Sequence, residues 1–285
     1  MSLSFKFGTV GSPTGTPKKP GGSVGAIEFS RSIGLEALEL GWVQSVRVTE
    51  ATCAVIKSTS EAHAVSLSVH APYFINLNAT DEEWTKSRKR LMDAAHYGYL
   101  AGATDIIFHP GSYFGNDPAD VLQVALPRLE GCVKELQKNG DMVTLRPETM
   151  GKSAMLGSFE DALAMSKAMD MVQPCLDFAH LHARPGDGTM NTYDEWSRLL
   201  EKYGKTLGAK ALKKLHIHLS GIEYGPKGEK NHLPFAEADL DLKALLKALH
   251  AFGCGGRILC ESPIMEEDAL HMKKMWMKVS GEKEK

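Results

Sequence analysis

Short apolar runs alternate with longer helical patterns along the whole chain, and this alternation restricts the possible folds more than any other feature. Most of the runs are continuously apolar, as expected for strands that are buried on both faces of a parallel sheet. We predict eight strands, at Phe5–Val10, Ala37–Gly41, Ser66–His70, Asp105–His109, Met142–Glu148, Val172–Asp177, Leu215–Leu219 and Arg257–Glu261.

The segments between these runs carry helix start signals and amphipathic patterns. A capping-box pattern at Thr80 begins a helix, because a Thr followed three residues later by Glu satisfies free backbone groups at a helix start. Further helices are predicted from Ser158, from Thr192, and over Leu240–Phe252 and Glu266–Val279. Repeated strand–helix units imply a parallel sheet with right-handed crossovers. With eight strands, a closed (β/α)8 TIM barrel is favoured over an open doubly wound sheet.

Length and composition agree with this fold. The 285 residues suit one TIM-barrel domain over 1–285, and we expect 280–285 to be a disordered tail. The net charge of −2 gives no global basic signal, although a local basic rim remains compatible with it. Five cysteines without a CxxC pair, and no secretory signal, favour the reducing cytoplasm. No apolar run approaches the roughly 20 residues that span a membrane, and we expect a monomer.

Six consecutive predicted strands, the third to the eighth, each end in a residue type that can bind a metal ion. Successive members of the series are separated by about one strand-plus-helix unit. Because the carboxyl ends of barrel strands share one rim, all six side chains are expected to meet there. The six residues are His70, His109, Glu148, Asp177, His218 and Glu261.

Together these residues predict a metal centre. A single His at a strand end is usually a hydrogen-bonded core residue, and a single carboxylate usually caps a helix or pairs with Arg. Three carboxylates buried close together cost several kcal/mol per unpaired charge, and no matching inward Lys or Arg is apparent. Mixed imidazole and carboxylate ligands suit zinc, manganese or iron. Six ligands are too many for one tetrahedral ion, so we expect two or three ions with Glu148 bridging a pair.

Other histidines are weighed by their position. His180 follows Asp177 by three residues, and His232 lies in the long loop after the seventh strand, so both can reach the rim. His182 is a weaker candidate. His216 shares the inward face of the seventh strand but lies one layer deeper, where a core role is expected. Four further histidines fall on helical patterns and are expected at the surface or in packing, namely His63, His96, His250 and His271.

The motifs around these residues resemble the endonuclease IV family of abasic-site DNA repair enzymes. The resemblance covers nearly all of the chain from His70 onward. It rests on Ser-Val-His70-Ala-Pro-Tyr-Phe-Ile-Asn-Leu, Phe-His109-Pro-Gly-Ser-Tyr, Pro-Glu148-Thr, Cys-Leu-Asp177-Phe-Ala-His180, Ile-His218-Leu and Leu-Cys-Glu261-Ser.

The resemblance implies a trinuclear zinc site, in a xylose isomerase-like TIM barrel, that cleaves duplex DNA 5′ to abasic nucleotides. From the donor chemistry, manganese or iron is an alternative at one site. Glu148 and Glu261 are the predicted catalytic carboxylates, and Tyr73 matches a family aromatic residue beside the opened DNA. By the same resemblance the first zinc is held by His70 and His109, the second by Asp177, His218 and Glu261, the third by His180 and His232, and Glu148 bridges the first two.

Four parts of the chain depart from the family pattern. Lys230 stands where the family has an aspartate two residues before its third-zinc His, so either the adjacent Glu229 replaces it or the third ion is weak or absent. Ser220 and Gly221 stand where Asn-Asp is usual. The first strand lacks the family's usual start, and the loop at Gly41–Val48 is unlike the family's loop, which carries DNA-penetrating residues.

An isomerase or epimerase of the related sugar-phosphate barrel superfamily is the alternative. Such enzymes use one metal and a Glu pair to move a proton beside a carbonyl, and Glu148 with Glu261 fits that pair. A one-metal site leaves His70, His109 and His180 without a role. A metal-stabilised binding module is the third hypothesis. For the endonuclease, candidate basic contacts to DNA are Lys18, Lys19, Arg184, Lys227 and Lys230.

Overall fold

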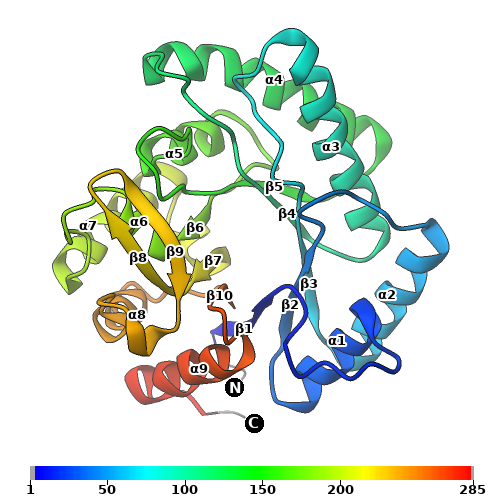
Figure 1. Cartoon of the computed structure of the whole chain (residues 1–285), viewed down its shortest axis with the longest axis vertical. Helices are drawn as coiled ribbons and strands as arrows, with labels where there is room; N and C mark the ends of the chain where they lie inside the picture. Colours follow the sequence, from blue (N-terminus) through cyan, green and yellow to red (C-terminus); the bar gives the residue numbers. More distant parts are fainter. Residues whose placement is uncertain (1–3, 284–285) are drawn as a thin grey trace.

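Eight parallel strands form a nearly closed ring in the computed structural model, which describes residues 4–283 (Figure 1). The strand order is β5-β4-β3-β2-β1-β10-β7-β6, and isolated bridges from Leu145 to Val172 and from Glu148 to Cys175 join β5 to β6. The predicted (β/α)8 TIM barrel is therefore confirmed. Its strands are β1 (Phe5–Val10), β2 (Ala37–Gly41), β3 (Ser66–His70), β4 (Asp105–Phe108), β5 (Thr144–Pro147), β6 (Cys175–Asp177), β7 (Leu215–Leu219) and β10 (Gly256–Cys260).

Helices surround this ring on the outside (Figure 1). Capping boxes form at the predicted helix starts Ser158 and Thr192, whereas at Thr80 only the side-chain bond to the Glu83 amide is present. The helices are α1 (Gly22–Ser32), α2 (Glu50–His63), α3 (Asp81–Leu100), α4 (Pro118–Asn139), α5 (Phe159–Ala168), α6 (Phe178–Ala183), α7 (Tyr193–Leu207), α8 (Leu242–Ala251) and α9 (Glu266–Ser280), with 3-10 turns at Ala211–Lys214 and Phe235–Glu237. Within residues 4–283, no helix combines the length and apolar character that a bilayer crossing needs.

The hydrophobic core lies between the strands and the helices. Fully buried side chains such as Leu67 on β3 and Leu91 on α3 belong to one part of it, and Ile258 on β10 and Trp276 on α9 belong to another. Burial of these apolar side chains, which contributes about 25 cal/mol per Å² of apolar surface, is the main force that holds the helices on the barrel.

The interior of the barrel contains several charged side chains, whereas the interiors of such barrels are normally filled by Val, Ile and Leu. Near the amino ends of the strands, Arg146 Nε donates to Asp105 Oδ1 at 2.6 Å, and Arg257 Nη2 lies 3.0 Å from Asp105 Oδ2. Burial alone raises the pKa of Asp105, but the two guanidiniums outweigh it and hold the pKa well below its usual range. These three residues, here called the basal triad, fill the end of the barrel opposite the predicted metal ligands.

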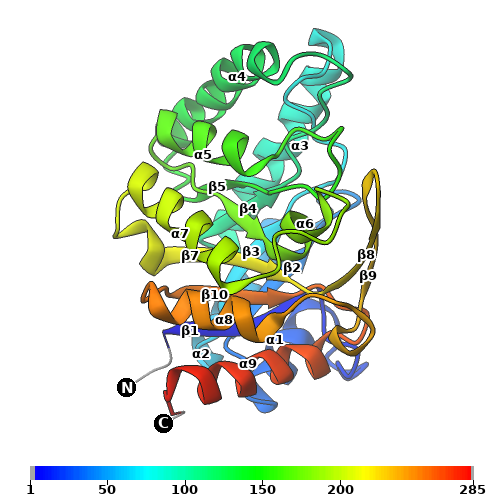
Figure 2. The ribbon, with the colours of Figure 1, turned by 90° about the vertical axis from the view of Figure 1, so that its left-hand side faces the viewer.

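Two predictions about irregular segments differ from the structure. The segment 221–235, expected to be a polar loop, forms a hairpin of β8 (Gly221–Gly225) and β9 (Gly228–Leu233) beyond the carboxyl ends of the barrel strands (Figure 2). The expected disordered tail begins at Ser280, yet α9 extends to that residue, and the Glu282 carboxylate accepts hydrogen bonds from Ser4 N and Trp276 Nε1. Residues 284 and 285 lie outside the described part of the chain.

Candidate metal centre

The carboxyl ends of the barrel strands bring the predicted ligands together around Glu148, which follows β5. His70 Nε2 and His109 Nε2 lie 3.3 and 3.4 Å from Glu148 Oε2. His218 Nδ1 and His180 Nδ1 lie 3.3 and 3.5 Å from Glu148 Oε1. The Glu148 side chain is fully buried, so it occupies the central position that the sequence predicted for it.

Three overlapping sets of possible ligands form at this mouth, and within each set the ligand atoms all lie within 4.8 Å of one another. His109 belongs to none of these sets, although it contacts Glu148. Each set offers three or four donors, which is the number that one zinc-like ion uses. The sets are His70, Glu148, His218 and Glu261; Glu148, Asp177, His180 and Glu261; and His180, Glu229 and His232.

Several of the histidines contact a neighbouring group through one ring nitrogen, which leaves the other ring nitrogen available to bind a metal ion. Nδ1 of His70 contacts the Ala71 carbonyl at 3.0 Å, and Nδ1 of His180 contacts the Thr149 carbonyl at 2.9 Å. Nδ1 of His232 lies 2.7 Å from Ser220 Oγ. A partner of this kind fixes the tautomer and orientation of a metal-binding imidazole. Ser220, noted above as a departure from the family pattern, therefore orients a predicted ligand.

Asp177 has a double role at the end of β6. Its Oδ1 accepts from the His180 amide at 2.7 Å and so caps α6, while Oδ2 lies 3.4 Å from His180 Nδ1. Oδ2 has no hydrogen bond within the described residues, and neither have Glu148 Oε2 and His180 Nε2, although all three atoms are buried. Such unsatisfied atoms are costly, and together they indicate a site for cations.

A β-bulge decides which residue of the hairpin faces this site. In the backbone register Glu223 pairs with Asn231, whereas the next residue, Tyr224, pairs with Glu229, so Lys230 is the extra residue without a backbone pairing partner on β8. The extra residue shifts the alternation of side chains by one. As a result Glu229 Oε2 lies 3.5 Å from His180 Nε2, while the Lys230 ammonium turns away. Of the two possibilities that the sequence left open, the structure places Glu229 beside His180.

The charge balance of the mouth favours divalent cations. Burial alone raises the pKa of Glu148, but His218 and the other imidazoles around it outweigh this and hold the pKa well below its usual range. Burial raises the pKa of Glu261. Burial lowers the pKa of His180, but Asp177 and the other carboxylates raise it to about 9. No described Lys or Arg forms an ion pair with these carboxylates, so protons on the histidines are their only counter-charges here.

Tyr73 lies at the edge of the same mouth. Its ring stacks on His109 at a centroid distance of 5.1 Å and meets His70 edge-on at 5.4 Å. The side chain is 46% exposed, and the neighbouring Phe74 is 59% exposed. Burial of the inner part of the ring, with the nearby Glu261, raises the pKa of Tyr73 to about 12, so its hydroxyl stays protonated at neutral pH.

Several other candidates have different tasks. Arg184, a predicted DNA contact, donates to the carbonyls of Met150, Lys152 and Met155 and so holds the loop after β5. Lys230, another predicted DNA contact, pairs with Glu223. Both side chains thus have partners within the chain, and their contacts to DNA stay predictions. His182 contacts the Thr189 carbonyl and Asp239, and His96 contacts Asp141. Lys18, Lys19 and Lys227 are exposed.

Sequence reasoning missed two residues beneath the mouth. Glu39 on β2 is fully buried and contacts both His216 and His218. Cys175 on β6 forms, with the same two histidines, a further group whose ligand atoms lie within 4.8 Å of one another. The available signal was a single carboxylate inside the apolar run Ala-Leu-Glu39-Leu-Gly, where an unpaired charge is expensive.

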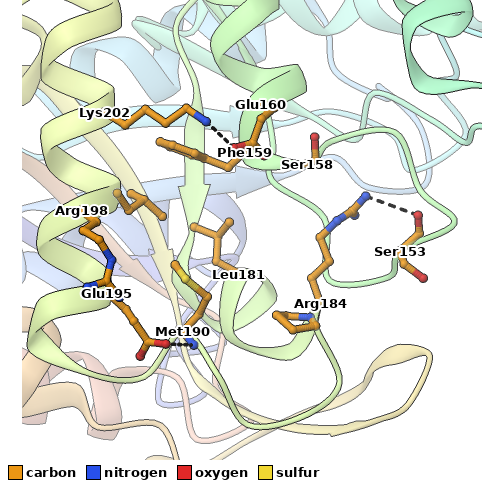
Figure 3. Close-up of a pocket in the computed structure, with 12 residues that line it drawn as sticks. Ser153, Ser158, Phe159, Glu160, Leu181, Arg184, Met190, Glu195, Arg198 and Lys202 are labelled. Atoms are coloured by element: carbon orange, nitrogen blue, oxygen red, sulfur yellow. Dashed lines mark hydrogen bonds and ion pairs between the residues drawn. The ribbon is translucent and has the colours of Figure 1, made fainter.

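A cavity of about 590 Å³ lies apart from these ligands (Figure 3). Phe159, Leu181 and Met190 line it from α5, α6 and the loop before α7, and Arg184 extends toward Ser153 at its side. None of the predicted metal ligands lines it, so the mouth of the barrel remains the candidate site.

Comparison with known sequences gives a consistent relationship. The family model described as a xylose isomerase-like TIM barrel matches residues 27–278. An uncharacterized protein of Methanocaldococcus jannaschii is 35% identical over 271 residues, which are 95% of this chain and 96% of that protein. A protein of Oceanobacillus iheyensis named "Probable endonuclease 4" is 29% identical over 174 residues, which are 57% of this chain and 54% of that protein.

Comparison with solved structures shows the same fold in proteins of different activity. A D-tagatose 3-epimerase-like protein superposes with a TM-score of 0.73 and 18% identity, over 97% of this chain and 98% of that one. Endonuclease IV from Thermus thermophilus superposes with a TM-score of 0.70 and 21% identity, over 98% of this chain and 100% of that one. At these identities the likeness concerns the fold alone.

Proposed function

The chain belongs to the xylose isomerase-like TIM barrel family, and from this premise we propose that it is a metal-dependent hydrolase that cleaves the DNA phosphodiester 5′ to abasic sites. The observation that carries the proposal is the presence of three overlapping ligand sets, of which two share Glu148 and Glu261 and the third shares His180. One set would serve a single ion, whereas overlapping sets that share carboxylates are the arrangement of multi-metal phosphodiesterases.

Zinc is the proposed metal, because its imidazole and carboxylate preferences match these donors. When bound, such ions stabilise the negative charge that develops on a phosphate during cleavage. Glu148 lies between the sets and would hold two ions at a fixed separation. Glu261 belongs to two of the sets and is the least buried of the carboxylates that they share, so we assign it the position beside an incoming phosphate.

Tyr73 supplies a surface for the nucleic acid. Its partly exposed ring lies over His109 and can stack beside an opened base step, as aromatic residues do in proteins that distort DNA. The sequence relative named "Probable endonuclease 4" supports this substrate class. Lys18, Lys19 and Lys227 remain the proposed basic contacts, since their charges are exposed and salt-sensitive attraction to phosphates needs exposed cations.

Sugar epimerization is the competing function, since epimerase-like proteins share the fold. The set of His70, Glu148, His218 and Glu261 can hold one ion between two Glu residues, which is what proton transfer beside a carbonyl requires. That function gives no task to the group of His180, Glu229 and His232, each of which is oriented toward the same mouth. The endonuclease accounts for both groups.

A metal count combined with two activity assays tests the proposal. Purified protein should contain two or three transition-metal ions per chain, and it should nick a duplex that carries an abasic analogue. EDTA should abolish the nicking, and an undamaged duplex of the same sequence is the control. One ion per chain, no nicking, and solvent exchange of a ketose α-proton would refute the endonuclease and favour the epimerase.

A further inference from the structure

Glu39 is an isolated carboxylate in the interior of the barrel. It lies in the middle of β2 between Leu38 and Leu40, and its side chain is fully buried. Its Oε2 accepts a hydrogen bond from Ser68 Oγ at 2.7 Å and contacts His216 Nε2 at 2.9 Å. Burying a carboxylate costs free energy. Its presence here therefore indicates a role that an apolar side chain could not fill.

The other oxygen of Glu39 faces a predicted metal ligand. Glu39 Oε1 lies 3.0 Å from His218 Nε2, at ion-pair distance, and neither of these buried atoms has a hydrogen-bonding partner in residues 4–283. On the opposite side of the ring, His218 Nδ1 lies 3.3 Å from both Glu148 Oε1 and Glu261 Oε1. His218 therefore presents Nδ1 to the metal centre and Nε2 to Glu39.

This arrangement is the reverse of that of the other ligands. His70 and His180 turn Nδ1 to a backbone carbonyl and keep Nε2 for the centre. His218 lies inside β7, which pairs with parallel strands on both sides, and its second nitrogen is met by a side chain from β2. Glu39 is the side chain in that position.

We propose that Glu39 is a positioning residue that accepts a hydrogen bond from the Nε2–H of His218 and thereby fixes the ring with Nδ1 toward the metal. The proposal depends on the metal centre of the proposed function but not on its DNA substrate. A carboxylate in this role also makes the imidazole a more basic ligand. Ser68 and His216 hold the Glu39 carboxylate in place from two other strands.

Glu39→Gln tests this role, because it keeps the shape of the side chain and removes the charge. Zinc affinity, measured by competition with a chelator, should fall about 10- to 100-fold, which is the usual cost of losing such a partner. The matched control is Glu36→Gln, which makes the same change just before β2 where the side chain is 30% exposed and far from the ligands. Thermal unfolding of the metal-free proteins shows whether the variant is folded.

The wild-type protein supplies a second measurement that needs no variant. In protein loaded with cadmium-113 and nitrogen-15 histidine, NMR should show coupling of the metal to His218 Nδ1 and a proton on Nε2. Coupling through Nε2, or at both nitrogens because a further ion binds Cys175 and His216, would overturn the proposal. Unchanged zinc affinity in folded Glu39→Gln would overturn it as well. Absence of metal binding by the wild-type protein would instead refute the proposed function.

Discussion

At the scale of single residues, the sequence predicted those site residues whose location at the rim follows from their place near the end of a strand. His70 and Asp177 end their strands, His218 is next to the last residue of β7, and any closed parallel barrel brings such residues to one rim. Glu39 was missed for the opposite reason. Its partners Ser68 and His216 are 29 and 177 residues away, so nothing near it in the sequence shows that its charge is satisfied. Long-range pairing is visible only in three dimensions.

Replacement of Glu261 tests the residue proposed to face the phosphate. Glu261→Gln removes one negative charge from two ligand sets at once while keeping the shape of the side chain. We expect cleavage to fall by at least about 100-fold, since even the loss of an outer partner of a ligand costs 10- to 100-fold. Rates are measured on the abasic duplex, and circular dichroism checks the fold. Glu267→Gln on α9, which contacts no ligand, is the control, and an unchanged rate in Glu261→Gln would remove Glu261 from the site.

At the scale of elements, the barrel strands and several helices could be predicted, whereas the β8–β9 hairpin could not. Buried strands are apolar, and capped helices begin with Ser or Thr followed by an acidic residue, so both kinds of element can be predicted from the sequence. The hairpin contains Gly221, Gly225, Pro226 and Gly228, and its exposed strands resemble a loop. The bulge at Lys230 is equally invisible, because its position depends on which residues pair across the hairpin.

The bulge makes a direct prediction about the third ligand set. Glu229→Gln should reduce the number of tightly bound ions by one, because Glu229 is the carboxylate beside His180 and His232. Lys230→Ala should leave the number unchanged, since the Lys230 side chain faces Glu223. Metal content after dialysis against a weak chelator distinguishes the two variants. Loss of an ion in Lys230→Ala with retention in Glu229→Gln would show that the hairpin adopts the other register.

At the scale of the whole molecule, the number of strands predicted a closed barrel, but not what fills it. The strands are predicted from their continuously apolar runs. The few charged residues inside these runs do not show whether their side chains point into the barrel or toward the helices. In the structure Asp105, Arg146 and Arg257 form the basal triad. Glu39 and His216 lie within the barrel beneath the metal ligands. The polar interior thus positions the metal ligands at the carboxyl ends of the strands. At the amino ends, the basal triad takes the place of apolar packing.

The basal triad makes stability depend on one carboxylate. Asp105→Asn leaves two buried guanidiniums without their counter-charge, and removing one partner of a buried pair typically costs about 3–5 kcal/mol. The free energy of unfolding in urea measures this loss. Asp93→Asn is the matched control, because Asp93 pairs with Lys89 on the surface of α3, where such pairs contribute at most about 1 kcal/mol. Equal losses in the two variants would show that the triad does not stabilise the barrel.

The pH dependence of that difference identifies its electrostatic origin. The pKa of Asp105 is lower in the folded protein than its value of about 3.9 in an unfolded chain, so its stabilising effect is fully present above that pH. As the pH falls below about 4, the unfolded chain binds the proton first and the stabilisation declines toward the folded pKa. The gap in unfolding free energy between wild type and Asp105→Asn should therefore be constant near neutrality and narrow in acid. A gap that stays constant down to pH ~2 would instead assign the loss to packing or hydrogen bonding, because those contributions do not titrate with this carboxylate.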